Sequence, residues 1–125
     1  MTTQGLNTPR QTHIDAVCKA HHLRYVQIQE WKKTPARVAA RRELLHRLCV
    51  VAWVEAIEAG MSSLRAREIH SLPRVGRSLR KHHTTVLYAI RQFSAQHYGT
   101  RPKATLAEMR EAYAASRQGQ MEIAA

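Results

Sequence analysis

The chain has 125 residues, 44% of them apolar, and its twenty Lys and Arg residues against nine Asp and Glu give a formal charge of +11. The length is that of one domain, and such a surplus of positive charge favours nucleic acid or an anionic membrane as partner. No apolar stretch approaches the roughly 18 residues that span a bilayer, and the N-terminus lacks a signal peptide's apolar core. Cys18 and Cys49 alone make no disulfide framework. We therefore expect a basic cytoplasmic domain without a membrane partner.

The N-terminal quarter of the sequence predicts helical structure followed by a basic loop. Residues 1–11 are expected to be flexible, and a capping box at residues 12–15, a hydroxyl followed three residues later by a carboxylate, opens the domain. Apolar residues then recur with helical spacing over residues 14–28. Residues 30–37 are polar and basic and include Pro35, so a loop or turn is expected there.

The longest predicted helix covers residues 38–59, which contain neither Gly nor Pro. Within it, residues 49–54 are apolar on all sides, a pattern that by itself also suits a buried strand. The flanking segments are rich in good helix formers, and they favour a long, largely buried central helix. Gly60 is expected to end this helix, and Trp53 is expected to lie in the core.

Two shorter helices and one longer one are predicted in the next part of the chain. Residues 62–70 form the first, and residues 71–79 form the second, in which Pro73 suits the first helical turn. A tight connection at residues 80–81 then leads into a helix that covers about residues 83–97.

A last helix is predicted beyond a break in the chain at residues 98–102. A second capping box at residues 105–108 opens it, and we assign residues 103–117 to it and residues 118–125 to a flexible tail. Its apolar stripe is expected to pack back on the domain or to dock a protein partner; the stripe consists of Leu106, Met109 and Tyr113. The sequence therefore predicts an all-α, compact domain over residues 12–98 with an extra C-terminal helix.

The helix that begins near His83 separates apolar from polar residues at 100° per residue. The apolar side consists of Val86, Ala89, Ile90, Phe93 and His97. The polar side consists of Thr84, Thr85, Tyr88, Arg91, Gln92 and Ala95. A short helix, a tight turn and a second helix with a polar outer side are typical of a helix-turn-helix, whose second helix enters the major groove of DNA. The alternative is that Thr84 or His83 caps the helix and the rest is a solvated surface.

The sequence HHTTVLYA at residues 82–89, preceded by SLPRVGRSL at residues 71–79, resembles the C-terminal DNA-binding domain of the bacterial replication initiator DnaA. In that family an acidic residue and His-Thr-Thr-Val-Leu-His-Ala follow a helix that begins Ser-Leu-Pro. Residues 14–48 are similar to the first half of the same domain, so the resemblance covers roughly residues 14–97.

The resemblance implies a division of roles on double-stranded DNA. His83, Thr84 and Thr85 match the residues that read bases, and the predicted base-reading set is His82, His83, Thr84, Thr85 and Tyr88. Leu72 and Pro73 match a pair that approaches a phosphate, and residues 32–37 match a loop that enters the minor groove. The full set predicted to contact the DNA backbone or the minor groove is Lys32, Lys33, Arg37, Arg42, Leu72, Pro73, Arg74, Arg77, Arg80, Lys81 and Arg91.

The chain departs from the family at four points. His82 replaces an aspartate that would accept a hydrogen bond from cytosine, and an imidazole can instead donate to guanine or to a phosphate. The turn before His82 is one residue shorter and lacks the family's glycines, and about ten extra residues occur near residues 58–67. No GxxxxGK[ST] phosphate loop is present, so no nucleotide is expected to bind.

Metal binding and catalysis receive little support from the sequence. Cys18 with His22, and His46 with Cys49, could form a zinc site between two helices, but buried cysteines more often act as small hydrophobes, and no metal is expected. Two-metal catalysis needs clustered carboxylates, whereas the glutamates are scattered and Asp15 is the only aspartate, so no enzyme is expected. Trp31 is expected to attach its loop to the core, or alternatively to stack on nucleic acid.

These observations predict a sequence-specific double-stranded DNA-binding protein without cofactors, associated with the nucleoid and acting as a transcription regulator. Two alternatives stay open. One is a replication-origin regulator that binds initiator-type boxes. The other is a basic adaptor that binds an acidic protein or structured RNA.

Overall fold

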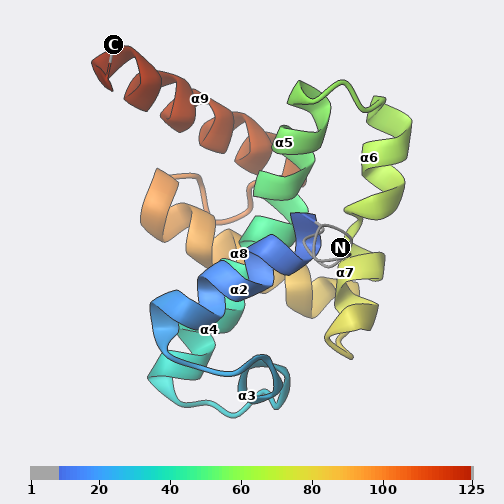
Figure 1. Cartoon of the computed structure of the whole chain (residues 1–125), viewed down its shortest axis with the longest axis vertical. Coiled ribbons are helices and arrows are strands. Elements are labelled where there is room, and N and C mark those ends of the chain that lie inside the picture. The colour runs from blue at the N-terminus through green and yellow to red at the C-terminus, as the bar shows by residue number, and fades with distance from the viewer. Residues whose placement is uncertain (1–8, 125) are drawn as a thin grey trace, which may run out of the picture.

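The computed structural model of the chain describes residues 9–124, and all regular secondary structure in that range is helical (Figure 1). The all-α prediction is therefore confirmed. The two ends that were predicted to be flexible fall partly outside the described residues, at residues 1–8 and 125. Within residues 9–124, none of the helices combines the length and the apolar character that a membrane span requires.

A continuous central helix runs through the middle of the molecule and confirms the predicted long helix. It consists of α4 (Pro35–His46), a π-helical turn η1 (Arg47–Val51) and α5 (Ala52–Glu58), and it ends before Gly60, whose φ is 97°. The π turn was not predicted. It lies where the sequence is apolar on all sides, and its last four residues are buried because α2, α7 and α9 surround it.

The helices around the central helix are α2 (Pro9–His21), α3 (Tyr25–Gln29), α6 (Ser63–Ile69), α7 (Leu72–Ser78), α8 (His83–Tyr98) and α9 (Leu106–Ala124). The helices α2, α3 and α8 pack on α4, while α9 packs on η1 and on α5. Figure 1 shows α3 near the beginning of the central helix and α6 beside its far end. The extra residues 58–67 form the end of α5, the connection and the start of α6.

Three predicted helix boundaries are wrong. The predicted loop at residues 30–37 ends early, because Thr34 caps α4 by accepting from the Arg37 amide and Pro35 suits the first helical position. The first helix starts at Pro9, since proline suits a first helical turn, and it ends at His21, before His22, whose φ is 54°.

The last helix is the third case, because it extends to Ala124 instead of ending near residue 117. Apart from Gly119, its last turns contain no strong helix breaker, so nothing local stops the helix. Its start is as predicted: the Thr105 hydroxyl accepts from the Glu108 amide at 3.1 Å.

The core forms where α2, α4, η1, α8 and α9 meet. Met109 of α9 is fully buried, and Leu106 and Tyr113 pack against the core, which confirms that the stripe on the last helix packs back on the domain. Trp53 was predicted to be a core residue, and this is wrong. Its ring is only partly buried and lies under the Arg110 guanidinium, 4.3 Å from the ring centroid.

Candidate nucleic-acid interface

The helices α7 and α8 are joined by a short turn that depends on Gly76. Ser71 caps α7 by accepting from the Arg74 amide at 3.3 Å, and the Lys81 amide donates back to the Gly76 carbonyl at 2.8 Å. A Cβ atom at residue 76 would overlap the Lys81 carbonyl oxygen. Residue 76 must therefore be a glycine, because the backbone of the turn passes directly over it. This role of Gly76 was not predicted from the sequence.

Arg80 occupies the position in this turn where glycine is favoured. Its φ is 58°, and its amide donates to the Arg77 carbonyl at 3.2 Å, as at a helix end closed by a left-handed residue. A non-glycine residue in this conformation costs free energy. The turn therefore carries an exposed arginine at a position that the backbone alone would give to glycine.

His82 caps the first turn of α8. Thr84 and His83, which were the candidate caps in the alternative interpretation of this helix, do not cap it. The Nδ1 atom of His82 accepts from the Thr84 amide at 3.3 Å and lies 2.9 Å from the Thr84 hydroxyl. The His82 ring also packs against the ring of His83, with 4.1 Å between centroids.

The predicted base-reading residues all lie on the exposed side of the head of α8. These exposed residues are His82, His83, Thr84, Thr85 and Tyr88, and Tyr88 has 61% of its surface exposed. The other side of the helix is anchored by Val86 and Ile90, which are fully buried. Burial of one such aliphatic side chain contributes about 1.5–3 kcal/mol, so the helix is held firmly while its polar head stays open to solvent.

The cations next to this head are exposed and pair with no carboxylate among residues 9–124. The sequence has no Asp or Glu between Glu68 and Glu108. Within the described residues, no ion pair is formed by the exposed cations of α7 and of the turn, which are Arg74, Arg77, Arg80 and Lys81. The exposed Pro73 and the partly buried Leu72, which packs against the core, precede them on α7.

Trp31 connects the basic loop to the α7–α8 turn. Its indole N–H donates to the Leu79 carbonyl at 3.2 Å, and the Lys81 ammonium lies 4.9 Å from its ring centroid. The ring packs against the core, as expected for a residue that attaches the loop. The exposed Lys32 and Lys33 follow directly, so the loop and the turn form one neighbourhood.

Arg41 supports this loop through hydrogen bonds to its backbone, and it was not among the predicted site residues. The side chain is buried, with 4% exposed, and its guanidinium donates to the carbonyls of Ile28 and Lys32 and lies 4.8 Å from the Trp31 ring centroid. A buried arginine in a basic sequence gives no signal that distinguishes it from its neighbours. Its hydrogen bonds to backbone oxygens become visible only in the folded chain.

Three of the predicted DNA-contacting arginines differ from the others in their surroundings. The Arg37 guanidinium donates to Glu30 at 2.9 Å, and 18% of its side chain is exposed. The Nε atom of Arg91 donates to the Ala104 carbonyl at 2.8 Å, which ties α8 to the segment before α9. Arg42 lies partly buried on α4. Arg37 and Arg91 are therefore bound within the fold, unlike the cations of the turn.

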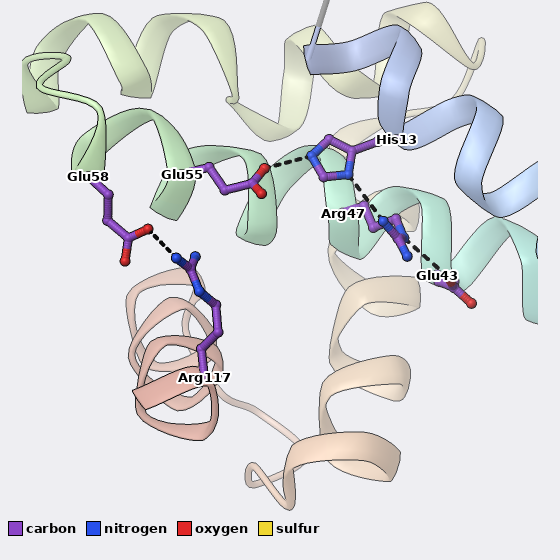
Figure 2. A network of polar contacts seen from close by, with 6 residues as sticks. All are labelled: His13, Glu43, Arg47, Glu55, Glu58 and Arg117. Carbon is purple, nitrogen blue, oxygen red and sulfur yellow. Dashed lines mark hydrogen bonds and ion pairs between the residues drawn. The ribbon is translucent and has the colours of Figure 1, made fainter. Parts of the chain in front are cut away.

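Elsewhere in the molecule, two arginines and a histidine are paired with acids, as Figure 2 shows. We call this group the polar network; it consists of His13, Glu43, Arg47, Glu55, Glu58 and Arg117. Arg47 donates to Glu43 at 3.1 Å and lies 3.4 Å from the His13 ring, which in turn lies 2.9 Å from Glu55. Arg117 of α9 donates to Glu58 of α5 at 2.6 Å.

The residues considered for zinc do not form a ligand set. Within the described part of the chain, no three His, Cys, Asp or Glu side chains gather as metal ligands would. Burial raises the pKa of Cys49 to about 12. His46 is buried among Phe93, Tyr98 and Tyr113, and its Nε2 has no hydrogen-bond partner among the described residues.

Comparison with known proteins adds no assignment: no family model, no curated protein and no solved structure matches this chain.

Proposed function

We propose that the protein binds double-stranded DNA in a sequence-specific manner and regulates transcription, with α7, the turn and the head of α8 acting as a helix-turn-helix. The observation that carries the proposal is the head of α8. It combines exposed hydrogen-bonding side chains with neighbouring cations that form no ion pair within the part of the chain that the structure describes. A surface of this kind suits a partner that offers both negative charge and hydrogen-bonding edges, as the major groove does.

The proposed contacts divide between the backbone and the bases. Arg77, Arg80 and Lys81 neutralise phosphates and fix the register of the helix, while the residues of the first turn of α8 reach base edges. Lys32 and Lys33 provide a second contact beside the turn, because Trp31 holds their loop against it. The activity proposed is binding and not catalysis.

Selection of bound duplexes from a random pool tests this function most directly. We expect enrichment of one motif, and affinity for that motif that exceeds affinity for random duplex by at least a factor of 1,000, which is the lower end for specific DNA-binding proteins. Equal affinity for selected and random duplex would contradict the proposal. Tighter binding to structured RNA or to an acidic protein would favour the adaptor alternative.

The sites bound in the genome then separate the two regulatory roles. Occupancy of promoters agrees with the proposed transcription regulator. Occupancy confined to an origin of replication would assign the same DNA-binding surface to replication control. A variant in which Thr84 and Thr85 are both replaced by Ala provides the control, since it should retain binding to random duplex and lose the enriched motif.

A further inference from the structure

The cap of α8 determines which hydrogen-bonding groups His82 and Thr84 can offer to a partner. The Thr84 amide is 3.3 Å from Nδ1 of His82, and a backbone amide can only donate. Nδ1 therefore accepts and carries no hydrogen of its own. The ring hydrogen of His82 is consequently on Nε2, the nitrogen that takes no part in the cap.

The Thr84 hydroxyl has its hydrogen-bonding role determined by the same nitrogen of His82. Its Oγ1 lies 2.9 Å from Nδ1 of His82, which has no hydrogen to donate, so the hydroxyl must donate to the ring. The amide and the hydroxyl share the one lone pair of Nδ1. Once its hydrogen is committed to His82, Thr84 offers only oxygen lone pairs to an outside group.

We propose that His82 and Thr84 form a single reading unit in which His82 is a donor that selects guanine and Thr84 is an acceptor that selects the amino group of a neighbouring base. Guanine presents two adjacent acceptors, N7 and O6, on its major-groove edge. Adenine has an amino group beside its single acceptor N7, thymine has a methyl group beside its acceptor O4, and cytosine presents an amino group, so a donor is best matched by guanine. The inference rests on the proposed function, because it specifies how the same surface reads DNA.

Two further observations favour a reading role. Both side chains are exposed, so the Nε2 edge of His82 and the oxygen of Thr84 are accessible. The ring of His83 packs on that of His82 at 4.1 Å between centroids and restricts its rotation. A donor and an acceptor held side by side on the first helical turn are suited to two adjacent groups on base edges.

Two substitutions that introduce side chains of nearly the same shape separate the capping role of His82 from its proposed base-reading role. Both His82→Asn and His82→Asp retain a side-chain oxygen that can cap α8. Only Asn keeps an outward donor, whereas ionised Asp is an acceptor only. Duplex selection should return guanine at one column of the motif for the wild type and for His82→Asn, and cytosine at that column for His82→Asp, each by about tenfold over the other bases.

Thr84 is tested in the same selection. Thr84→Ser keeps the hydroxyl and should keep adenine or cytosine at the neighbouring column, while Thr84→Val should lose that preference and leave the guanine column in place. Melting temperatures of all four variants show whether the fold is intact. Identical motifs for His82→Asn and His82→Asp, with both proteins folded, would overturn the inference.

The tautomer can be measured without DNA, which keeps this inference distinct from the proposed function. In long-range ¹H–¹⁵N spectra of the free protein we expect the His82 hydrogen on Nε2 and a bare Nδ1. A hydrogen on Nδ1 would overturn the reading unit even if the protein binds a specific motif. Conversely, a bare Nδ1 in a protein that enriches no motif would leave the cap intact and refute the proposed function.

Discussion

The cations of the polar network and those of the α7–α8 turn have different surroundings, although both lie in the same small fold. In the network, Arg47 donates to Glu43 and Arg117 donates to Glu58, and each pair joins two helices or successive turns of one (Figure 2). At the turn, Arg77 and Arg80 are exposed and form no ion pair within the described residues.

The net charge of +11 is therefore not equally available for binding at every part of the surface. An exposed ion pair such as Arg117–Glu58 contributes only about 0–1 kcal/mol to stability, but it neutralises the cation that it contains. The segment without carboxylates keeps its charge available for a partner. Four predictions test this comparison.

The largest effect is expected from acid, and it should arise at buried His46, which is close enough to Arg47 and Glu43 of the network to be affected by their charges. The pKa of His46 is lowered to about 4, chiefly by burial and also by nearby His97 and Arg47, while Glu43 opposes them. Because the ordinary pKa is 6.5, the unfolded chain binds this proton first as the pH falls. Stability present above pH 6.5 should therefore decrease by about 3 kcal/mol as the pH falls to about 4.

Denaturant unfolding at a series of pH values measures this decrease. The pKa of His13 is also lowered, mainly by burial, so it acts in the same direction below pH 6.5. Burial raises the pKa of Glu43, but the hydrogen bonds from His21 and Arg47 outweigh it and lower the pKa, so Glu43 acts in the same direction below pH 4.5. His46→Leu should flatten the curve in this window. A curve that is flat in the wild type, or equally steep in the variant, would contradict the role of His46.

The second prediction concerns the backbone that supports the free cations. Gly76→Ala should reduce the free energy of unfolding by about 1–3 kcal/mol, because the added methyl group overlaps a backbone carbonyl that cannot move away alone. Gly119→Ala is the matched control. No atom lies within 4 Å of its added Cβ atom, and its helical position should gain about 1 kcal/mol. Thermal melts of both variants measure the two changes in stability. Equal shifts in melting temperature would contradict the special role of Gly76.

The third prediction sets one arginine from each region against the other. Arg77→Ala should weaken binding to both selected and random duplex about tenfold at low salt and reduce the salt slope by about one unit, since one phosphate contact is lost. Arg117→Ala removes the same charge from the network and should leave DNA affinity unchanged, because that arginine is already bound to Glu58. Fluorescence anisotropy at several salt concentrations compares them. Equal losses would mean that only total charge matters.

The smallest effect is expected from the left-handed residues. Arg80→Gly and His22→Gly should each raise stability by up to about 1 kcal/mol, since both residues have φ values near +55° that glycine adopts without strain. Only Arg80→Gly should weaken DNA binding. If His22→Gly weakens DNA binding by the same factor, the α7–α8 turn is not a specific part of the interface.

Much of the fold could be predicted because its signals are local. Ser71, Thr105 and Pro73 mark helix starts through contacts within one turn, and the alternation of Val86, Ile90 and the polar head of α8 follows from helical geometry alone. The predicted site residues on α8 are accordingly exposed together on one turn.

The parts that could not be predicted depend on contacts between distant residues or on side-chain rotamers. The bond from Trp31 to Leu79 spans 48 residues, and no local pattern encodes it. The burial of Arg41 and the partial exposure of Trp53 likewise depend on which helices become neighbours. The cap by His82 depends on the side-chain rotamer of one imidazole ring. The known preferences of residue types for the N-cap position do not predict such a cap.

The position of Trp31 also makes it an intrinsic fluorescent probe of the α7–α8 turn. The chain contains two tryptophans, and Trp53 lies under Arg110 between α5 and α9, away from the turn. Trp31 instead donates its indole hydrogen to the turn and has the Lys81 ammonium above its ring. A phosphate that draws Lys81 away would alter the emission of Trp31, so the fluorescence of a Trp53→Phe protein should follow occupancy of the turn in real time without any added label.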